Sequence, residues 1–167
     1  MEREFSAGGA VVSFQDGRWR LAVIEPRPAE QKRARRQKPA LALPKGLVNR
    51  GERPEEAAVR EVREETGIET ELITKLADIR YVYMRSWGDG QRVFKVVSFY
   101  LLIYRSGAIG EIEPAMRIEV RNAKWIPLEE ARRQLTHRGE QEVAQLALEY
   151  IDSHPGLNSS KLRDSPR

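Results

Sequence analysis

Three glutamates, Glu61, Glu64 and Glu65, are spaced so that one face of a helix would carry all of them. At 100° per residue they fall within an arc of about 100°. Like charges at this spacing repel one another by a few tenths of a kcal/mol per pair. A divalent cation removes that repulsion, and clustered carboxylate oxygens suit Mg²⁺ or Mn²⁺. The spacing therefore predicts a site for one of these ions.

A short helix must carry these carboxylates, and the sequence marks both of its ends. Pro54 suits a first helical turn and Gly67 suits a helix C-terminus, which predicts a helix over 54–66. The opposite side of this helix would face a core with Ala58, Val59, Val62 and Thr66. A loop that opens at Gly46 leads into the helix.

The whole stretch follows a known spacing. Gly46 is followed after five residues by Glu52, and after seven more by Arg60-Glu61, an apolar residue, a free position, Glu64-Glu65, a free position, Gly67 and the apolar Ile68. This resembles the Nudix box at every fixed position. The resemblance implies an α/β fold, the Nudix fold, in which a mixed β-sheet is sandwiched between α-helices. It also implies hydrolysis of a nucleoside diphosphate that is linked to another group.

The resemblance assigns roles to the residues of the box. The metal ligands would be Glu61, Glu64, Glu65 and the carbonyl of Gly46, and bound Mg²⁺ or Mn²⁺ would neutralise phosphate charge and activate water. Arg60 and Glu52 would form an ion pair that supports the loop.

A further glutamate outside the box is expected on the loop before the last strand, as a base or an additional ligand. Glu119 fits that description best, and Glu113 is its rival. The attacking water would be oriented by Glu61 or Glu119.

The residues just before the box resemble one branch of the family. Leu43-Pro44-Lys45-Gly46 is similar to the lead-in of dinucleoside polyphosphate hydrolases, in which Lys45 would hold a phosphate as a point charge. Relatives often carry Trp two residues before the Leu of this lead-in, where Leu41 stands here. The lead-in favours a diadenosine polyphosphate as the substrate, and ADP-ribose, oxidised nucleoside triphosphates and 5′-triphosphorylated RNA stay open. A Nudix-fold nucleotide-binding regulator without turnover is the alternative from another class.

The strand patterns predict a sheet around this helix. Apolar runs cover 5–14 and 19–24, joined by an Asp16-Gly17 turn, and a Gly8-Gly9 pair marks a bulge or a close backbone approach. Further strands are expected at 70–76, 79–84, 93–104 and 123–126, with a turn at 86–90. The strands at 79–84 and 93–104 are expected to form a hairpin. Dinucleoside polyphosphate hydrolases use aromatic residues of this region to stack a base and basic residues to hold phosphate, so the resemblance implies these substrate-binding candidates: Arg80, Tyr81, Tyr83 and Lys95.

The segment 26–39 is a basic loop with six basic residues and one acid between prolines. It is either a solvated insertion or a flap that closes over a polyphosphate or touches RNA. An amphipathic helix is expected to close the domain before residue 152, and His137 and His154 are expected to be surface residues.

Composition bounds the remaining possibilities. The 167 residues, with 40% hydrophobic and 32% charged residues, predict a single domain over 1–152 and a flexible tail over 153–167. No apolar run approaches a membrane span, no signal peptide opens the chain, and the absence of cysteine fits a cytoplasmic setting. The net charge of +4 suits an anionic nucleotide and does not by itself argue for nucleic acid. Many relatives dimerise, so a homodimer is a further expectation.

Overall fold

The first strand is the centre of the sheet in the computed structural model, which describes residues 1–27, 38–85, 88 and 90–158. Strand β1 (Glu2–Gln15) pairs antiparallel with β2 (Arg18–Pro26) and with the short β3 (Lys45–Leu47), and parallel with β5 (Arg92–Ser106). Strand β4 (Glu69–Met84) adds to β5, and β6 (Val120–Pro127) adds to β2. The sheet is therefore mixed, in the order β4-β5-β1-β2-β6, with β3 off this path.

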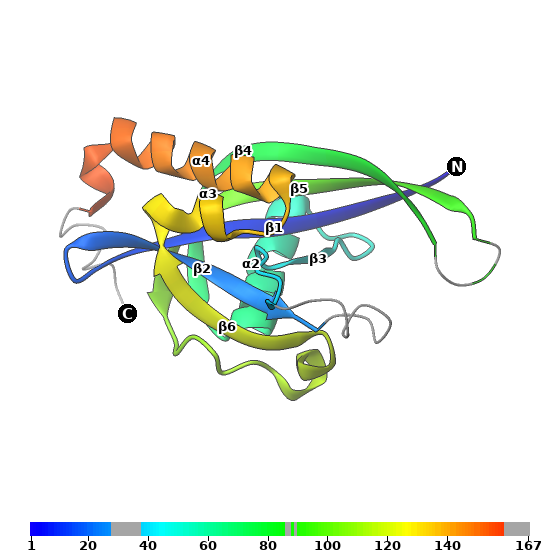
Figure 1. Cartoon of the computed structure of the whole chain (residues 1–167), viewed down its shortest axis with the longest axis horizontal. Helices are drawn as coiled ribbons and strands as arrows, with labels where there is room; N and C mark the ends of the chain where they lie inside the picture. The colour runs from blue at the N-terminus through cyan, green and yellow to red at the C-terminus, as the bar shows by residue number, and fades with distance from the viewer. Residues whose placement is uncertain (28–37, 86–87, 89, 159–167) are drawn as a thin grey trace.

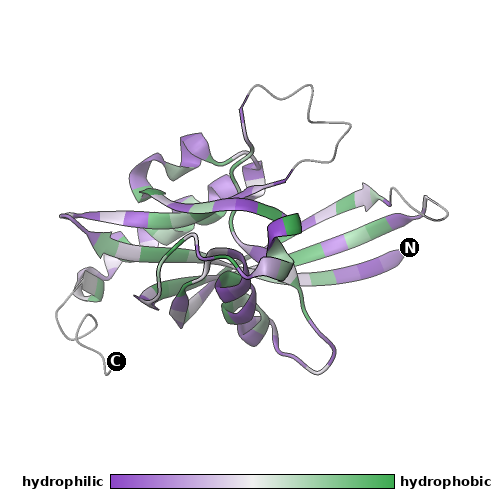
Figure 2. Ribbon diagram, turned by 90° about the horizontal axis from the view of Figure 1, so that it is seen from below, coloured by the Kyte–Doolittle hydropathy of each residue, from purple (hydrophilic) through white to green (hydrophobic). Residues whose placement is uncertain are grey.

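Helices cover both faces of the sheet, as Figure 1 shows. Alternate residues of β1 face opposite sides, so Ala10 and Val12 pack with helices α3 (Ala131–Gln134) and α4 (Arg138–Ser153). Ala7 and Val11 pack instead with α2 (Pro54–Thr66). Because both faces are covered, the middle of β1 is buried continuously over 6–12. Figure 2 shows hydrophobic and hydrophilic stretches along the strands. This confirms the predicted architecture, a mixed sheet between α-helices.

Short 3-10 helices complete the chain. η1 (Pro114–Ile118) precedes β6, η2 (Leu128–Glu130) precedes α3, and η3 (Pro155–Asn158) follows α4. Leu157 in η3 packs against the core, so regular structure extends beyond residue 152. No helix among the described residues is long and apolar enough to cross a bilayer.

Two local features were well marked in the sequence. Asp16 and Gly17 form the tight turn between β1 and β2 with φ angles of 52° and 79°. Gly8 lies where two backbones approach closely, because a Cβ at that position would overlap the Pro44 carbonyl oxygen. The segment that carries Lys45 therefore lies directly against β1.

The observed strands differ from the predicted ones mainly at β4. The patterns at 70–76 and 79–84 belong to one continuous strand, whose pairing with β5 is irregular at Glu69/Thr70, Leu72/Thr74 and Lys75/Ala77. Each irregularity shifts the register by one residue, which makes one strand resemble two in the sequence. Of the predicted turn at 86–90, residues 86, 87 and 89 lie outside the described residues, as do residues 28–37 of the basic loop and 159–167 of the tail.

Candidate active site

Strand β3 and helix α2 meet at Gly46 and Glu61. The Glu61 side chain is buried against the β3 backbone, and a Cβ on Gly46 would overlap its carboxyl carbon and both of its oxygens. Only glycine leaves room for this carboxylate, which explains in physical terms why the site begins with Gly46. Helix α2 itself runs over the predicted residues and ends at Gly67, whose φ of 86° is left-handed.

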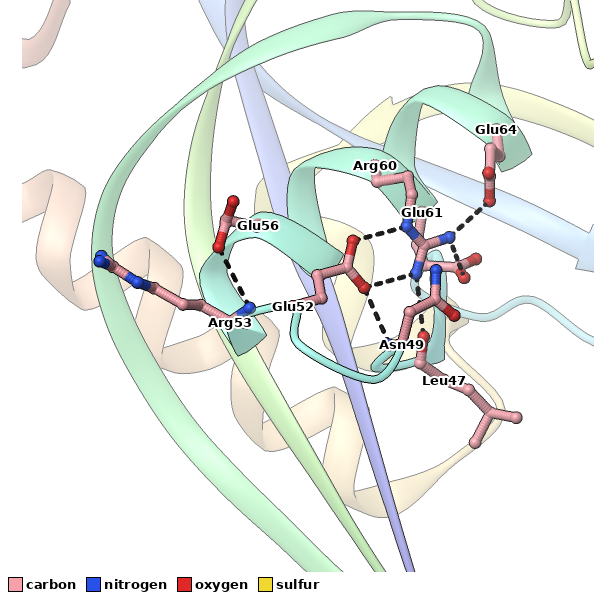
Figure 3. Close-up of polar contacts among 8 residues, drawn as sticks. All are labelled: Leu47, Asn49, Glu52, Arg53, Glu56, Arg60, Glu61 and Glu64. Carbon is pink, nitrogen blue, oxygen red and sulfur yellow. Dashed lines mark hydrogen bonds and ion pairs between the residues drawn. The ribbon is translucent and has the colours of Figure 1, made fainter.

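Arg60 connects the loop before α2 to the glutamates of the helix (Figure 3). Its guanidinium donates two hydrogen bonds to the Glu52 carboxylate, at 2.7 and 3.0 Å, and one to the Leu47 carbonyl oxygen at 2.9 Å. Its remaining nitrogen donates to Glu61 at 2.8 Å and to Glu64 at 2.9 Å. Glu52 also accepts a hydrogen bond from the Asn49 N–H. Arg60 therefore holds the loop at Leu47 and at Glu52.

These contacts perturb the pKa values of the ion pair. The hydrogen bond to Glu52 raises the pKa of Arg60, and the same bond lowers the pKa of Glu52. Both groups therefore stay charged over the physiological range. The structure thus brings Arg60 and Glu52 together in the pairing that the sequence predicted.

The two buried glutamates of α2 behave in the opposite way. Burial raises the pKa of Glu65 to about 8. The hydrogen bond from the Lys45 N–H lowers this pKa, while the negative charges of Glu61 and Glu119 raise it further. Burial also raises the pKa of Glu61, partly offset by Arg60. Glu119, the residue that follows η1, adds a smaller contribution to the raised pKa of both glutamates. Glu119 therefore stays the candidate for the additional carboxylate, with Glu113 as its rival.

The carboxylates offer the donor set that a hard divalent cation requires. Glu61 and Glu65 are 7% and 4% exposed, so their like charges are close together and poorly hydrated. No three acidic or histidine side chains in the described part of the chain converge on a single point as they stand. Arg60 engages the oxygens of both Glu61 and Glu64 instead. The carboxylate oxygens are donors of the kind that Mg²⁺ or Mn²⁺ prefers.

A pocket of about 640 Å³ lies on the other face of the sheet, next to Lys45. Strands β4 and β5 and the first turn of α4 form its walls, with Arg80, Tyr81, Phe99 and Glu140 among the lining residues. Lys45 connects it to the glutamates, because its backbone N–H donates to Glu65 Oε1 at 2.9 Å. Three of the predicted substrate-binding residues, Lys45, Arg80 and Tyr81, are thus brought to one pocket.

Two other candidates lie elsewhere. Tyr83 donates to Glu4 Oε2 at 3.0 Å, and Lys95 pairs with Glu4 Oε1 at 3.0 Å, further along the strands that project beyond the helices in Figure 1. Neither lines the pocket. His137 and His154 are exposed as predicted, although His137 borders the pocket at the start of α4.

Sequence reasoning missed Glu140. It is 4% exposed, accepts the Leu43 N–H at 2.7 Å, and pairs with the Lys45 ammonium at 3.1 Å. A signal was present, because Glu140 is aligned at helical spacing with the buried Val143, Ala144, Ala147 and Ile151. An acid on the apolar stripe of a helix requires a buried partner.

Comparisons with known proteins agree with this geometry. The NUDIX domain family model matches residues 17–147. A Mycobacterium tuberculosis (strain CDC 1551 / Oshkosh) protein named "Putative mutator protein MutT4" is 34% identical over 154 residues. The match covers 89% of this chain and 56% of that protein, so the chain spans about half the length of its curated relative.

Solved structures share the fold. The Ap4A hydrolase of C. elegans, in a binary complex, superposes with a TM-score of 0.65 and 20% identity over 90% of this chain and 98% of that one. The NUDIX domain of Shewanella oneidensis NrtR, in complex with ADP ribose, superposes with a TM-score of 0.68 and 16% identity over 90% of each chain. At these identities the likeness concerns the fold.

Proposed function

The chain belongs to the NUDIX domain family, and we propose that it is a metal-dependent pyrophosphohydrolase that cleaves a nucleoside diphosphate linked to another group. The observation that carries this proposal is the cluster of Glu61, Glu64 and Glu65 on α2, with Gly46 opposite and Arg60 holding the loop. A Nudix-fold regulator without turnover would have no need to keep these neighbouring acids, because Glu61 and Glu65 are buried and their ionisation destabilises the protein.

The residues of the chain divide the chemistry between them. When bound, Mg²⁺ or Mn²⁺ lowers the pKa of water and neutralises charge on the phosphates. Glu61, Glu64, Glu65 and the carbonyl of Gly46 would hold the ion. Glu119, or Glu61 as the alternative, would accept the proton of the attacking water and orient it. Arg60 and Glu52 keep the loop in place while these groups act.

The pocket beside Lys45 is proposed as the nucleoside site. The Lys45 ammonium would hold the phosphate chain between the carboxylates of α2 and the pocket, with Arg80 contributing a second positive charge. Tyr81, which is 41% exposed at the pocket, offers a ring on which a base could stack. Tyr83 and Lys95 would touch the substrate only if it extends along the projecting strands.

We further propose that a diadenosine polyphosphate is the substrate. The Leu43-Pro44-Lys45-Gly46 lead-in supports this choice, and the likeness of fold to an Ap4A hydrolase is compatible with it. The pocket also leaves room for ADP-ribose or a nucleoside triphosphate, so substrate preference has to be measured.

The test is a substrate panel. Purified protein with Mg²⁺ or Mn²⁺ is offered diadenosine polyphosphates, ADP-ribose, oxidised nucleoside triphosphates and 5′-triphosphorylated RNA, and the products are separated chromatographically. We expect diadenosine polyphosphates to give the highest kcat/KM. The Glu64→Gln variant serves as the reference, and the catalytic proposal is wrong if the wild-type protein cleaves no substrate faster than this variant.

A further inference from the structure

Lys45 is held by both helical layers of the fold. Its backbone N–H donates to Glu65 of α2, and its ammonium lies 3.1 Å from Glu140 of α4. Burial alone would lower the pKa of Lys45, but the charge and hydrogen bond of Glu140, together with the charges of Glu65 and Tyr81, outweigh burial, so the pKa is raised. The residue is thereby fixed at its backbone by one helix and at the end of its side chain by the other.

Glu140 is itself firmly positioned. One carboxylate oxygen accepts the Leu43 N–H at 2.7 Å while the other pairs with Lys45. The start of α4 lies tightly on the sheet at the preceding residue, because a Cβ on Gly139 would come within 2.8 Å of the Ile79 side chain. Glu140 is therefore held by the Leu43 N–H at its carboxylate and by the close packing of the α4 backbone at Gly139, and it is 4% exposed.

We propose that Glu140 is a positioning residue that fixes the Lys45 ammonium between the carboxylates of α2 and the pocket. The proposal rests on the proposed function, in which Lys45 holds the phosphate chain. A lysine side chain has a flexible four-carbon stem with many rotamers, so a free ammonium would not keep one position. Small displacements of a group that orients the reacting phosphate lower the rate strongly.

This role makes an asymmetric prediction for kinetics. Replacing Glu140 by Gln removes a negative charge, which does not weaken the attraction of an anionic substrate. Gln still offers an oxygen to the Leu43 N–H. The KM should therefore stay the same or fall, while kcat drops about tenfold because the ammonium is no longer held. In a Lys45→Met background the same substitution should change kcat less than about twofold.

The first readout is spectroscopic and needs no substrate. In ¹⁵N-labelled protein, the side-chain ammonium of Lys45 should give a signal protected from solvent exchange, assigned by its loss in Lys45→Met. We expect this signal to disappear in Glu140→Gln and to persist in Glu149→Gln, a control on the exposed side of the same helix. Persistence of the signal in Glu140→Gln would overturn the proposal, whether or not the protein hydrolyses any substrate.

The second readout is the kinetic cycle of Glu140→Gln, Lys45→Met and the double variant, with thermal unfolding measured for each. If Glu140→Gln lowers kcat equally in the wild type and in the Lys45→Met variant, Glu140 serves only to dock α4, which contradicts the proposal. If Glu140→Gln does not fold, Glu140→Asp replaces it, because the shorter side chain cannot reach Leu43 and Lys45 together. A wild-type protein that is inactive on the whole panel would instead refute the proposed function, while the ammonium signal still reports on the Lys45 contact.

Discussion

Replacing Glu65 by Gln should stabilise the protein at alkaline pH in the absence of metal. Glu65 is 4% exposed, and burial raises the pKa of its carboxyl group from 4.5 to about 8. Gln is close to the same size, keeps the oxygen that accepts the Lys45 N–H, and carries no charge at any pH. The substitution therefore removes the ionisation and little else.

The magnitude follows from the pKa change. Each unit is worth about 1.36 kcal/mol, so a rise from 4.5 to about 8 amounts to at most about 5 kcal/mol. Because the folded pKa of this acid is raised, the folded state keeps its proton longer than the unfolded chain. The contribution of Glu65 is thus most favourable below about pH 4.5, declines as the pH rises towards about 8, and is constant above.

The assay is urea unfolding of both proteins in EDTA across this pH range. The two free energies of unfolding should agree near about pH 4.5, and the Gln variant should be the more stable by several kcal/mol near about pH 9. Mg²⁺ at about 100 times its Kd should narrow this difference, since a bound ligand adds about 2.7 kcal/mol and the wild type has the fuller set of carboxylates. Glu149→Gln is the exposed control and should follow the wild type. Parallel curves for the wild type and Glu65→Gln in EDTA would refute the reasoning.

Three further substitutions test the site. Gly46→Ala should lower kcat about 100-fold, because the added methyl group displaces the Glu61 carboxylate. In Gly156→Ala the new Cβ meets no atom within 4 Å, so this control should keep the wild-type rate. Equal steady-state rates for Gly46→Ala and the wild type would contradict the close approach of Gly46 and Glu61. Arg60→Lys should lower the free energy of unfolding in urea by about 2 kcal/mol, because lysine cannot reproduce the forked hydrogen bonds, and an unchanged midpoint would show that the fork is dispensable. Glu119→Gln should reduce kcat about 100-fold and Glu113→Gln less than about twofold, and the reverse order would make Glu113 the additional carboxylate.

Helix α2 could be predicted from the sequence because its signals are local. Pro54 and Gly67 set its ends within a single stretch, and the helical period alone places three glutamates on one side. The resemblance to the Nudix box then supplied the pairing of Arg60 with Glu52, which the structure contains. Such features depend on residues fewer than about ten positions apart, where backbone geometry leaves few alternatives.

The surroundings of the helix could not be predicted as well, because they depend on long-range register. The register of β4 shifts at three places, one of them at Lys75/Ala77 between the two predicted strands, and no local pattern indicates these shifts. Tyr81 and Tyr83 were both predicted as candidates for base stacking, yet Tyr81 lines the pocket whereas Tyr83 donates to Glu4, 79 residues away. The contact between Lys45 and Glu140 likewise depends on α4 crossing the sheet, although an acid on an apolar stripe was a visible anomaly.

The segment around Lys45 is the only described place where a single residue bonds to acids from both α2 and α4. Gly8 and Gly46 make this possible, because each removes a Cβ where this segment packs against β1 or against α2. The carboxylates that would hold a metal lie on one face of the sheet and the proposed nucleoside pocket on the other. It follows that a change in the pocket wall, such as Tyr81→Ala, should alter which nucleotide is preferred while leaving metal affinity unchanged. A change at Lys45 should affect every substrate that carries the same phosphates.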